Sequence, residues 1–371
     1  MLTTRVRLST MMMALAGVSL SIATEPIRIA EGQGALAPKQ PQACIGPDGS
    51  VHLVFGVGSA VHYCHSSDGG VTFEPAKMAF QVENMPLGMR RGPRVAVAER
   101  SIVVTAIGGR KGKGQDGDVL AWRSADNGET WKGPIRVNDV ADSGREGLHA
   151  MAAGADGAVW CVWLDLRNKR TELFASKSTD GGATWSANTL VYRSPEKSIC
   201  ECCHPSIAVA KNGIHVLFRN SLAGNRDMYV TTSVDDGRSF STAKRLGLEH
   251  WSLNACPMDG GMLAVDASGK ISTVWRRAGE LFCTLDSPAE VSLGRGEQAW
   301  IASTPRGPIA VWTEGRVGQL RIRLMADAES SILDHTARDA MIVSNKQGII
   351  ACWESVTDSN TQLKVKKIDA P

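Results

Sequence analysis

The sequence has few tyrosines, no long charged tract and no low-complexity linker. Three tyrosines occur among 371 residues, and none follows Tyr229. Lysine and arginine number 41 against 38 aspartate and glutamate. A charge so close to balance gives no reason to expect nucleic acid or an anionic membrane as a partner. Because no segment rich in proline, serine or charge divides the chain, we interpret residues 24–371 as a single domain.

The N-terminal segment has the features of a signal peptide. Arg5 and Arg7 precede an uncharged run over residues 8–23, which ends in the small-residue sequence Ser21-Ile22-Ala23. These features predict a signal peptide over residues 1–23. An uncleaved membrane anchor is the weaker alternative, because the apolar run is short and interrupted by serine. We therefore expect a periplasmic or secreted protein that has no contact with the membrane after cleavage.

An eight-residue phrase occurs four times in the first two thirds of the chain. The copies are Ser66–Phe73, Ser124–Trp131, Ser178–Trp185 and Ser233–Phe240, and their aspartates are Asp68, Asp126, Asp180 and Asp235. The aspartates lie 58, 54 and 55 residues apart, and a nearly fixed period of this size predicts a propeller or a repeat array. Serine and aspartate side chains can bond their own backbone, and glycine supplies a positive φ, so each copy predicts a hairpin turn.

This phrase resembles the Asp box, or bacterial neuraminidase repeat, of the sialidase superfamily. In that family the box closes the turn between the third and fourth strands of a blade, on the face away from the ligand site. The resemblance implies an all-β fold, a β-propeller of four-stranded antiparallel blades. It also implies that the chain, if it is an enzyme, is a sialidase-like glycoside hydrolase.

A weaker repeat extends beyond the Asp boxes. Apolar runs entered from a tight turn recur along the whole chain and read as second strands of blades. Their number favours seven blades, with six as the alternative, since sialidases have six. Residues 26–29 resemble Pro134–Val137, which follows the second Asp box as a fourth strand, and the last blade ends after a third strand. We therefore predict that the N-terminal strand pairs with the last blade and closes the ring.

Arginine is frequent in the segments that should lie at the face opposite the Asp boxes. A guanidinium group donates two parallel bonds to a carboxylate and stays charged, so such a mouth suits an anionic ligand. Sialidases hold the sugar carboxylate with three arginines. The candidates for ligand binding are Arg94, Arg167, Arg219, Arg226 and Arg276. The alternative for each of them is an ordinary solvated surface residue.

The residues for catalysis are less clear than those for binding. The late tyrosine nucleophile of sialidases has no match, because no tyrosine follows Tyr229. A pair of carboxylates could hydrolyse a glycoside instead. The candidates near the mouth are Asp165, Asp227 and Asp259, with Glu146 as a further carboxylate and His204 for proton transfer. For Asp165, bracing of a neighbouring arginine is favoured over catalysis.

Four residues of metal-binding types, three cysteines and one histidine, are clustered within five positions. Cys200, Cys202, Cys203 and His204 stand at the expected start of one blade, and Cys256 stands at the matching place in the next. In an oxidising compartment we expect a disulfide between these neighbouring blades. The alternative is a soft ion, Zn²⁺ or Cu⁺, bound by the same five residues. The sequence requires no other cofactor.

Two hypotheses of different class follow. The first is an exported sialidase-like propeller that recognises an anionic glycan or a small carboxylate ligand at an arginine-rich axial mouth and hydrolyses a glycoside without the late tyrosine. The second is a non-catalytic propeller that binds a ligand or a protein partner, with the Cys/His cluster as a disulfide brace or metal site. The polar mouth favours the first hypothesis, and the missing tyrosine favours the second.

Overall fold

The described structure is almost entirely β. A computed structural model describes residues 25–98, 101–112, 114–285 and 289–369. The signal peptide predicted over residues 1–23 lies outside these ranges. Within them, no helix has the length and apolar character needed to cross a membrane. Their single helical element is a short 3₁₀ helix, η1 (Gly34–Leu36), and the other elements are strands, so the predicted all-β class is confirmed.

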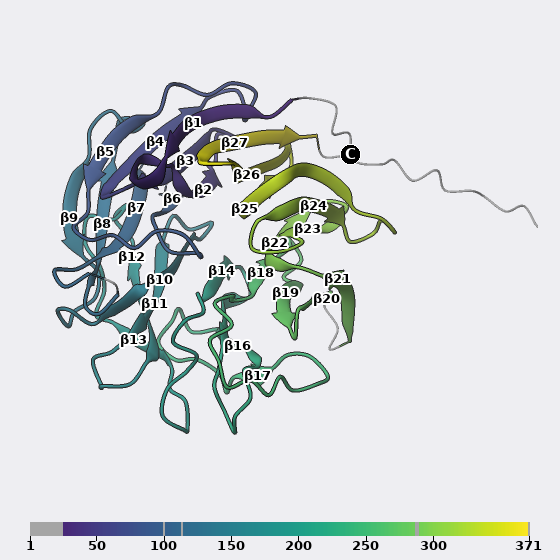
Figure 1. The fold of residues 1–371 in the computed structure, drawn as a ribbon. Coiled ribbons are helices and arrows are strands. Elements are labelled where there is room, and N and C mark those ends of the chain that lie inside the picture. The colour runs from purple at the N-terminus through teal and green to yellow at the C-terminus, as the bar shows by residue number, and fades with distance from the viewer. Residues whose placement is uncertain (1–24, 99–100, 113, 286–288, 370–371) are drawn as a thin grey trace, which may run out of the picture.

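Antiparallel sheets are arranged in a ring (Figure 1). Five of them have four strands each, in sequence order, and we call them blades 1 to 5. Their strands are β2–β5 (Lys39–Ile45, Val51–Val57, Ala60–Ser66, Lys77–Gln81), β6–β9 (Arg94–Ala98, Ser101–Gly108, Asp118–Ser124, Lys132–Arg136), β10–β13 (Gly144–Ala153, Val159–Asp165, Glu172–Ser178, Thr189–Tyr192), β14–β17 (Ser206–Ala210, Gly213–Arg219, Met228–Ser233, Lys244–Arg245) and β18–β21 (Met262–Val265, Ile271–Arg277, Glu280–Leu285, Glu290–Arg295).

The remaining sheet has seven strands in the order β1-β27-β26-β25-β24-β23-β22. Their bounds are Ile27–Gln33 for β1, Glu297–Thr304 for β22, Gly307–Thr313 for β23, Gly318–Leu324 for β24, Ser331–Asn345 for β25, Gly348–Thr357 for β26 and Asn360–Ile368 for β27. The first half of β25 pairs with β24 and its second half with β26, the change falling at Ala337. This sheet therefore contains two four-stranded units, blades 6 and 7, which share one continuous strand.

The N-terminal strand closes the ring, as predicted. β1 runs antiparallel to β27, with Ile27 opposite Val365 and Gln33 opposite Asn360, and Figure 1 shows the two strands side by side. β1 thereby becomes the fourth strand of blade 7. The first strands of successive blades contact one another around the axis, and blade 7 meets blade 1 through β25 and β2.

The second strands of the blades are buried, because neighbouring blades cover both of their faces. All seven residues of β11 are buried, including Trp163 and Asp165. Near-continuous apolar sequences such as this one are typical of strands enclosed on both sides. The predicted second strands are confirmed in this respect.

The four Asp boxes close the turns between third and fourth strands and share one hydrogen-bond pattern. In the box of blade 2, Ser124 Oγ donates to Asp126 Oδ1 at 2.7 Å, and the Thr130 amide donates to the same oxygen at 2.9 Å. The Gly128 amide donates to Ser124 Oγ at 2.8 Å. The equivalent bonds to Asp68, Asp180 and Asp235 are present in the other three boxes. The aspartate therefore fixes the turn by replacing backbone partners.

Each Asp-box glycine packs against the preceding blade. A Cβ added to Gly128 would lie 2.0 Å from Tyr63 of blade 1, and one added to Gly237 would lie 2.1 Å from Trp160 of blade 3. Gly70 is equally close to Ile350 of blade 7, and Gly182 lies against Val103 of blade 2. Glycine is required here for its size as well as for its positive φ.

Replacing Gly237 with alanine tests this contact between blades. Gly224 is a matched control, because its φ of +76° is close to the +74° of Gly237 and nothing lies within 4 Å of an added Cβ. Both variants carry the cost of a left-handed alanine, so their difference isolates the packing. We expect G237A to lower the free energy of unfolding by about 1–3 kcal/mol more than G224A in chemical denaturation. Equal losses would contradict the role of the contact.

The Asp boxes should also make the fold sensitive to acid. Hydrogen bonds from Thr130 lower the pKa of Asp126 from 3.8 to about 2, and bonds from Ser239 do the same for Asp235. A lowered pKa stabilises the folded state fully above about pH 4, and this contribution is lost as the pH falls towards about 2. In urea titrations across this range, we expect the D126N/D235N variant to lose less stability than the wild type. Identical pH slopes would show that the two carboxylates do not contribute.

Candidate functional site

Strained backbone gathers at the end of the ring opposite the Asp boxes, which we call the front face. Six residues other than glycine have a left-handed conformation, with φ between 48° and 66°, near the point where a first strand begins. They are Gln40, Arg90, Glu146, Met258, Gln298 and Asp339. Such conformations are costly for these residue types, and they cluster at functional sites. The centre of the front face is therefore the candidate site.

Hydrogen bonds across the axis hold this strained centre together. The buried Arg90 guanidinium donates to the carbonyl oxygens of Ala340, at 2.7 Å, and of Gln298. The Gln298 side-chain oxygen accepts a bond from the Asp339 backbone amide at 2.6 Å, and the Gln298 backbone amide donates to Asp259 Oδ2 at 3.0 Å. These bonds join the entry to blade 2 with blades 6 and 7 and with the entry to blade 5.

Two of the predicted ligand-binding arginines are occupied by backbone carbonyls. Arg94 is 5% exposed and Arg219 is 1% exposed. Every guanidinium nitrogen of both residues donates to a carbonyl oxygen. The acceptors of Arg94 are Arg90, Gly92, Pro93 and His149, and those of Arg219 are Arg226, Asp259 and Arg276. Each arginine thus makes four hydrogen bonds to backbone, and both side chains are buried, so both support loops of the front face and neither is presented to a ligand carboxylate.

Asp165 braces Arg167, as the sequence favoured. Asp165 is completely buried, and its Oδ1 accepts from Arg167 Nε at 2.9 Å. Its Oδ2 accepts from Arg167 Nη2 at 2.9 Å, Ser143 Oγ at 2.8 Å and Trp163 Nε1 at 2.8 Å. Arg167 also bonds Asp139 at 2.7 Å. All these contacts are with the protein itself, so the alternative catalytic role of Asp165 and the ligand-binding role of Arg167 receive no support from the geometry.

Asp259 and Arg276 lie together at the entry to blade 5. Arg276 Nε is 3.5 Å from Asp259 Oδ2, and Arg276 Nη1 is 2.9 Å from Glu297 Oε1. Arg276 Nη2 donates to the Pro257 carbonyl at 2.9 Å. This predicted acid and this predicted arginine are thus brought together, but as partners of each other. Arg226 is half-buried beside them, and its carbonyl accepts from Arg219.

Asp227 is engaged by the loop that follows blade 4. Its Oδ2 lies 2.5 Å from His250 Nδ1, and its Oδ1 accepts from the Trp251 amide at 2.8 Å. The carboxylate is buried, whereas His250 is 58% exposed. The arrangement orders the loop around Trp251, whose ring lies beneath the guanidinium groups of Arg219 and Arg276.

His204 faces the axis and lies apart from the sulfur atoms of the neighbouring cysteines. Its Nε2 is 3.4 Å from Met262 Sδ, and its ring lines an axial cavity of about 290 Å³ together with Arg94 and Trp300. Burial, aided by the positive charges of Arg90 and Arg94, lowers the pKa of His204 well below its ordinary value. A neutral imidazole is therefore expected at neutral pH. Its grouping with the cysteines as a metal ligand is wrong, because the ring is directed elsewhere.

Three cysteine sulfurs form a compact buried cluster. Cys200 Sγ lies 3.7 Å from Cys202 Sγ and 3.5 Å from Cys203 Sγ, and the latter two are 4.0 Å apart. All nine cysteines are free thiols, so the expected disulfide between blades is not formed. Hydrogen bonds from Cys202 and Cys203, assisted by Arg219 and Arg226, lower the pKa of Cys200 below its ordinary value. Cys256 is mostly exposed. Partial burial of its thiol, together with its interaction with Cys202, raises its pKa to about 11.

A chain of opposite charges crosses the front face and was not singled out as a unit from the sequence. Glu146 Oε2 is 3.2 Å from Arg91 Nη2, and Glu146 Oε1 is 3.5 Å from Arg145 Nε. Arg145 Nη2 is 3.4 Å from Glu201 Oε2. Glu146 and Glu201 are 25% and 46% exposed, so both can meet a ligand. Their separation of 55 residues, one Asp-box interval, was the signal in the sequence that marks them as equivalent positions.

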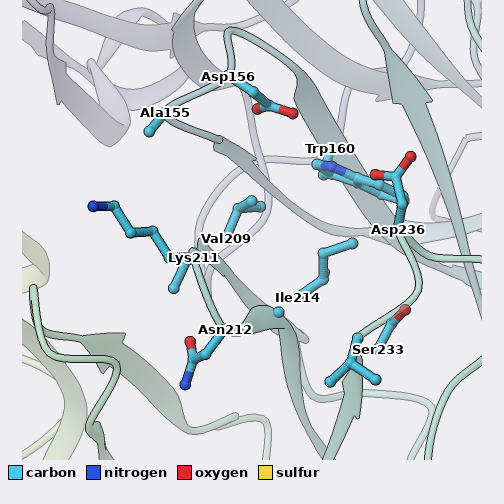
Figure 2. Close-up of a pocket in the computed structure, with 12 residues that line it drawn as sticks. Ala155, Asp156, Trp160, Val209, Lys211, Asn212, Ile214, Ser233 and Asp236 are labelled. Carbon is cyan, nitrogen blue, oxygen red and sulfur yellow. The ribbon is translucent and has the colours of Figure 1, made fainter.

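A second pocket, of about 590 Å³, opens at the rear between blades 3 and 4. Figure 2 shows the apolar side chains of Trp160, Val209 and Ile214 with Asp156, Lys211 and Asp236 around them. None of the residues predicted for ligand binding or catalysis lines this pocket. Part of the pocket wall is formed by an Asp box, whose role in this fold is structural.

The tyrosines of the chain serve the core. Tyr63 OH is bonded to His52 Nδ1 at 2.7 Å, and burial raises its pKa. Tyr192 OH accepts from Asn220 Nδ2 at 3.0 Å, and Tyr229 stacks on Phe218. No tyrosine is therefore placed as a nucleophile at the front face.

The closed ring and its repeated turns define the protein as an Asp-box β-propeller. Residues 107–266 match the BNR repeat-like domain family, which confirms the resemblance to the bacterial neuraminidase repeat. No curated protein matches the chain by sequence.

Solved structures with this fold cover nearly the whole chain. A Dyadobacter fermentans protein of unknown function is 15% identical with a TM-score of 0.58, over 94% of this chain and 98% of that one. A Penicillium chrysogenum α-L-arabinanase complexed with arabinobiose is 13% identical with a TM-score of 0.54, over 93% and 97%. The Hadza microbial sialidase Hz136 is 16% identical with a TM-score of 0.55, over 92% and 68%. Identities this low show a shared fold alone.

Substituting Asp165 with asparagine distinguishes bracing from catalysis. The change removes the completely buried charge that the Arg167 guanidinium faces, so we expect a loss of about 3–5 kcal/mol in the free energy of unfolding. Asp139 is the control, because it contacts the same guanidinium but is 46% exposed. We expect D139N to cost less than about 1 kcal/mol. Chemical denaturation measures both, and a D165N variant as stable as D139N would rule out the brace.

Proposed function

We propose that this protein is a glycoside hydrolase that binds a saccharide at the front face, with Glu146 and Glu201 as its carboxylate pair. The observation that carries the proposal is the placement of both carboxylates against one guanidinium group, that of Arg145. They come from the entries to two neighbouring blades, beside the strained centre of the ring. Both remain partly exposed, in contrast to Asp165, Asp227 and Asp259.

The spacing of the two carboxylates suits glycoside hydrolysis. Since each lies within 3.5 Å of the same guanidinium group, the two are within roughly 9 Å of each other, and glycosidases place their carboxylate pairs about 5–9.5 Å apart. One carboxyl group protonates the leaving oxygen, while the other acts as nucleophile or activates water. No tyrosine is needed in this arrangement.

The environments of the two glutamates suggest their separate roles. Glu146 contacts two guanidinium groups, from Arg91 and Arg145, which hold its carboxylate in place. We assign Glu146 as the nucleophile or general base. Glu201 is the other member of the pair, so we assign it as the general acid; it contacts one guanidinium group and accepts from Thr171 Oγ1 at 3.4 Å. Arg145 then positions both groups.

The comparisons support a saccharide as the ligand class without identifying the sugar. An arabinanase bound to arabinobiose and a sialidase share the fold. A sialidase-like grip by three arginines has little support, since Arg94 and Arg219 use their donors on carbonyl oxygens. Action on saccharides outside the cytoplasm agrees with the export that residues 1–23 predict.

Binding of an anionic glycan without hydrolysis is the second candidate function. It is favoured by Arg145, which contacts both carboxylates, and by Arg226, a half-buried cation near Cys200 and Cys256. In this case the arginines would carry the affinity and the carboxylates would only position them. The two candidates therefore differ in which substitutions matter.

Hydrolysis of a panel of aryl glycosides, including an α-L-arabinofuranoside and a sialoside, tests the first candidate. We expect E146Q and E201Q to lower kcat by about 10²–10⁴-fold on the substrate that the wild type cleaves, because each removes one proton-transfer or nucleophilic group. Glu129→Gln is the control, since Glu129 is an exposed carboxylate in the rear Asp box of blade 2, away from the proposed site.

Full activity in E146Q or E201Q would contradict the assignment. The second candidate function would be supported instead if the wild type cleaves nothing in the panel but binds anionic glycans. In that case R145M and R226M should lose the affinity.

A further inference from the structure

Cys200, Cys202 and Cys203 share a tight turn with Glu201, but the proposed hydrolysis makes no use of the three thiols. The three side chains are 1%, 8% and 2% exposed and share their environment with Met258. The tight turn that bears them is anchored by two backbone bonds, from the Ile199 amide to the Thr171 carbonyl and from the Cys200 amide to the Arg219 carbonyl, both at 3.1 Å. Three sulfurs from four consecutive residues thus point to one place.

We propose that Cys200, Cys202 and Cys203 bind a soft d¹⁰ cation, Cu⁺ or Zn²⁺, through three thiolates. The distances between the sulfurs carry this inference. A metal bonded to sulfurs at about 2.3 Å holds them about 3.8 Å apart in a tetrahedral site and about 4.0 Å apart in a planar one. The observed separations of 3.7, 3.5 and 4.0 Å meet this requirement without rearrangement.

A metal accounts for the cluster better than a disulfide. A disulfide joins two sulfurs at about 2.05 Å, so it would draw one pair together and leave the third thiol buried without a partner. A metal ion uses all three. No other group of histidine, cysteine or carboxylate ligands this compact occurs in the part of the chain that the structure describes.

Charges around the cluster compensate the thiolates. Three thiolates with Cu⁺ carry a charge of −2, and with Zn²⁺ a charge of −1. The positive charges of Arg219 and Arg226 both act on Cys200. A buried anionic complex needs such partners. The ligands bind as thiolates, so each thiol that is still protonated releases its proton on binding, and no oxidation state changes.

Cys256 offers a fourth ligand and a way to separate the two cations. It comes from the entry to blade 5, interacts with Cys202 and is exposed. Zn²⁺ takes four ligands, whereas Cu⁺ suits a site made of soft thiolates alone. With Zn²⁺ we therefore expect Cys256 to complete a tetrahedron that connects blades 4 and 5.

Metal titration of the full chain tests the site. The protein is prepared without oxygen, reduced, stripped of metal and titrated with Zn²⁺ or Cu⁺ against a chromogenic chelator, and bound metal is counted by mass spectrometry. We expect one equivalent in the wild type and less than a tenth of an equivalent in C200S/C203S. Cys283→Ser is the control, because Cys283 is a buried thiol outside the cluster, and it should retain one equivalent.

Cys256→Ser separates the two ions. We expect it to weaken Zn²⁺ binding at least tenfold and to leave Cu⁺ binding unchanged within threefold if Cu⁺ is the three-coordinate occupant. X-ray absorption on the loaded wild type provides a readout that depends on no variant. It should show three or four sulfur ligands at about 2.3 Å.

Several results would overturn the proposal. These are a reduced wild type that binds neither ion, a C200S/C203S variant that binds as well as the wild type, or a first coordination shell of nitrogen and oxygen. None of these readouts depends on glycoside hydrolysis. A negative result in the metal titration therefore does not test the carboxylate pair, and a negative result in the hydrolysis assay does not test the cysteine site.

Discussion

The contact between an Asp-box glycine and the preceding blade is the constraint on which this ring depends. Gly128 and Gly237 approach Tyr63 and Trp160 so closely that hydrogen is the largest side chain that fits. The hydrogen bonds of the aspartate, which are the same in all four boxes, fix the turn, and the turn fixes the position of the glycine. A local hydrogen-bond pattern is thereby converted into the spacing between neighbouring sheets.

At the front face, polar bonds replace this apolar contact. Arg90 and Arg219 donate across blade boundaries to backbone carbonyls, and both are buried, so they hold the blades and are not presented to a ligand. Glu146 and Glu201 are held differently, because they share Arg145 and keep part of their surface in solvent. The front face therefore contains two kinds of polar residue: those that hold the blades together, and those that remain accessible to a ligand.

The sequence predicted the elements whose partners are close in the chain or repeat along it. The Asp-box turns, the buried second strands and the pairing of β1 with β27 followed from such patterns. The arginines could not be assigned, because a carbonyl acceptor such as that of Asp259, 40 residues from Arg219, has no signature in the sequence. His204 was grouped with the cysteines by adjacency, but its ring is directed to Met262. The pairing of Glu146 with Glu201 was readable only through the repeat interval.

The shared strand β25 gives the ring unequal joints. Between blades 1 to 6, neighbours meet through side chains, and two such packed surfaces can slide or separate without breaking a backbone ladder. Blades 6 and 7 pack through side chains as well, but they are also joined by backbone, since the hydrogen bonds of β24 and β26 meet on one uninterrupted strand. Separating these two blades would break a backbone ladder, whereas the other joints, among them the one between blades 3 and 4 where Glu146 and Glu201 face each other, depend on side-chain contacts.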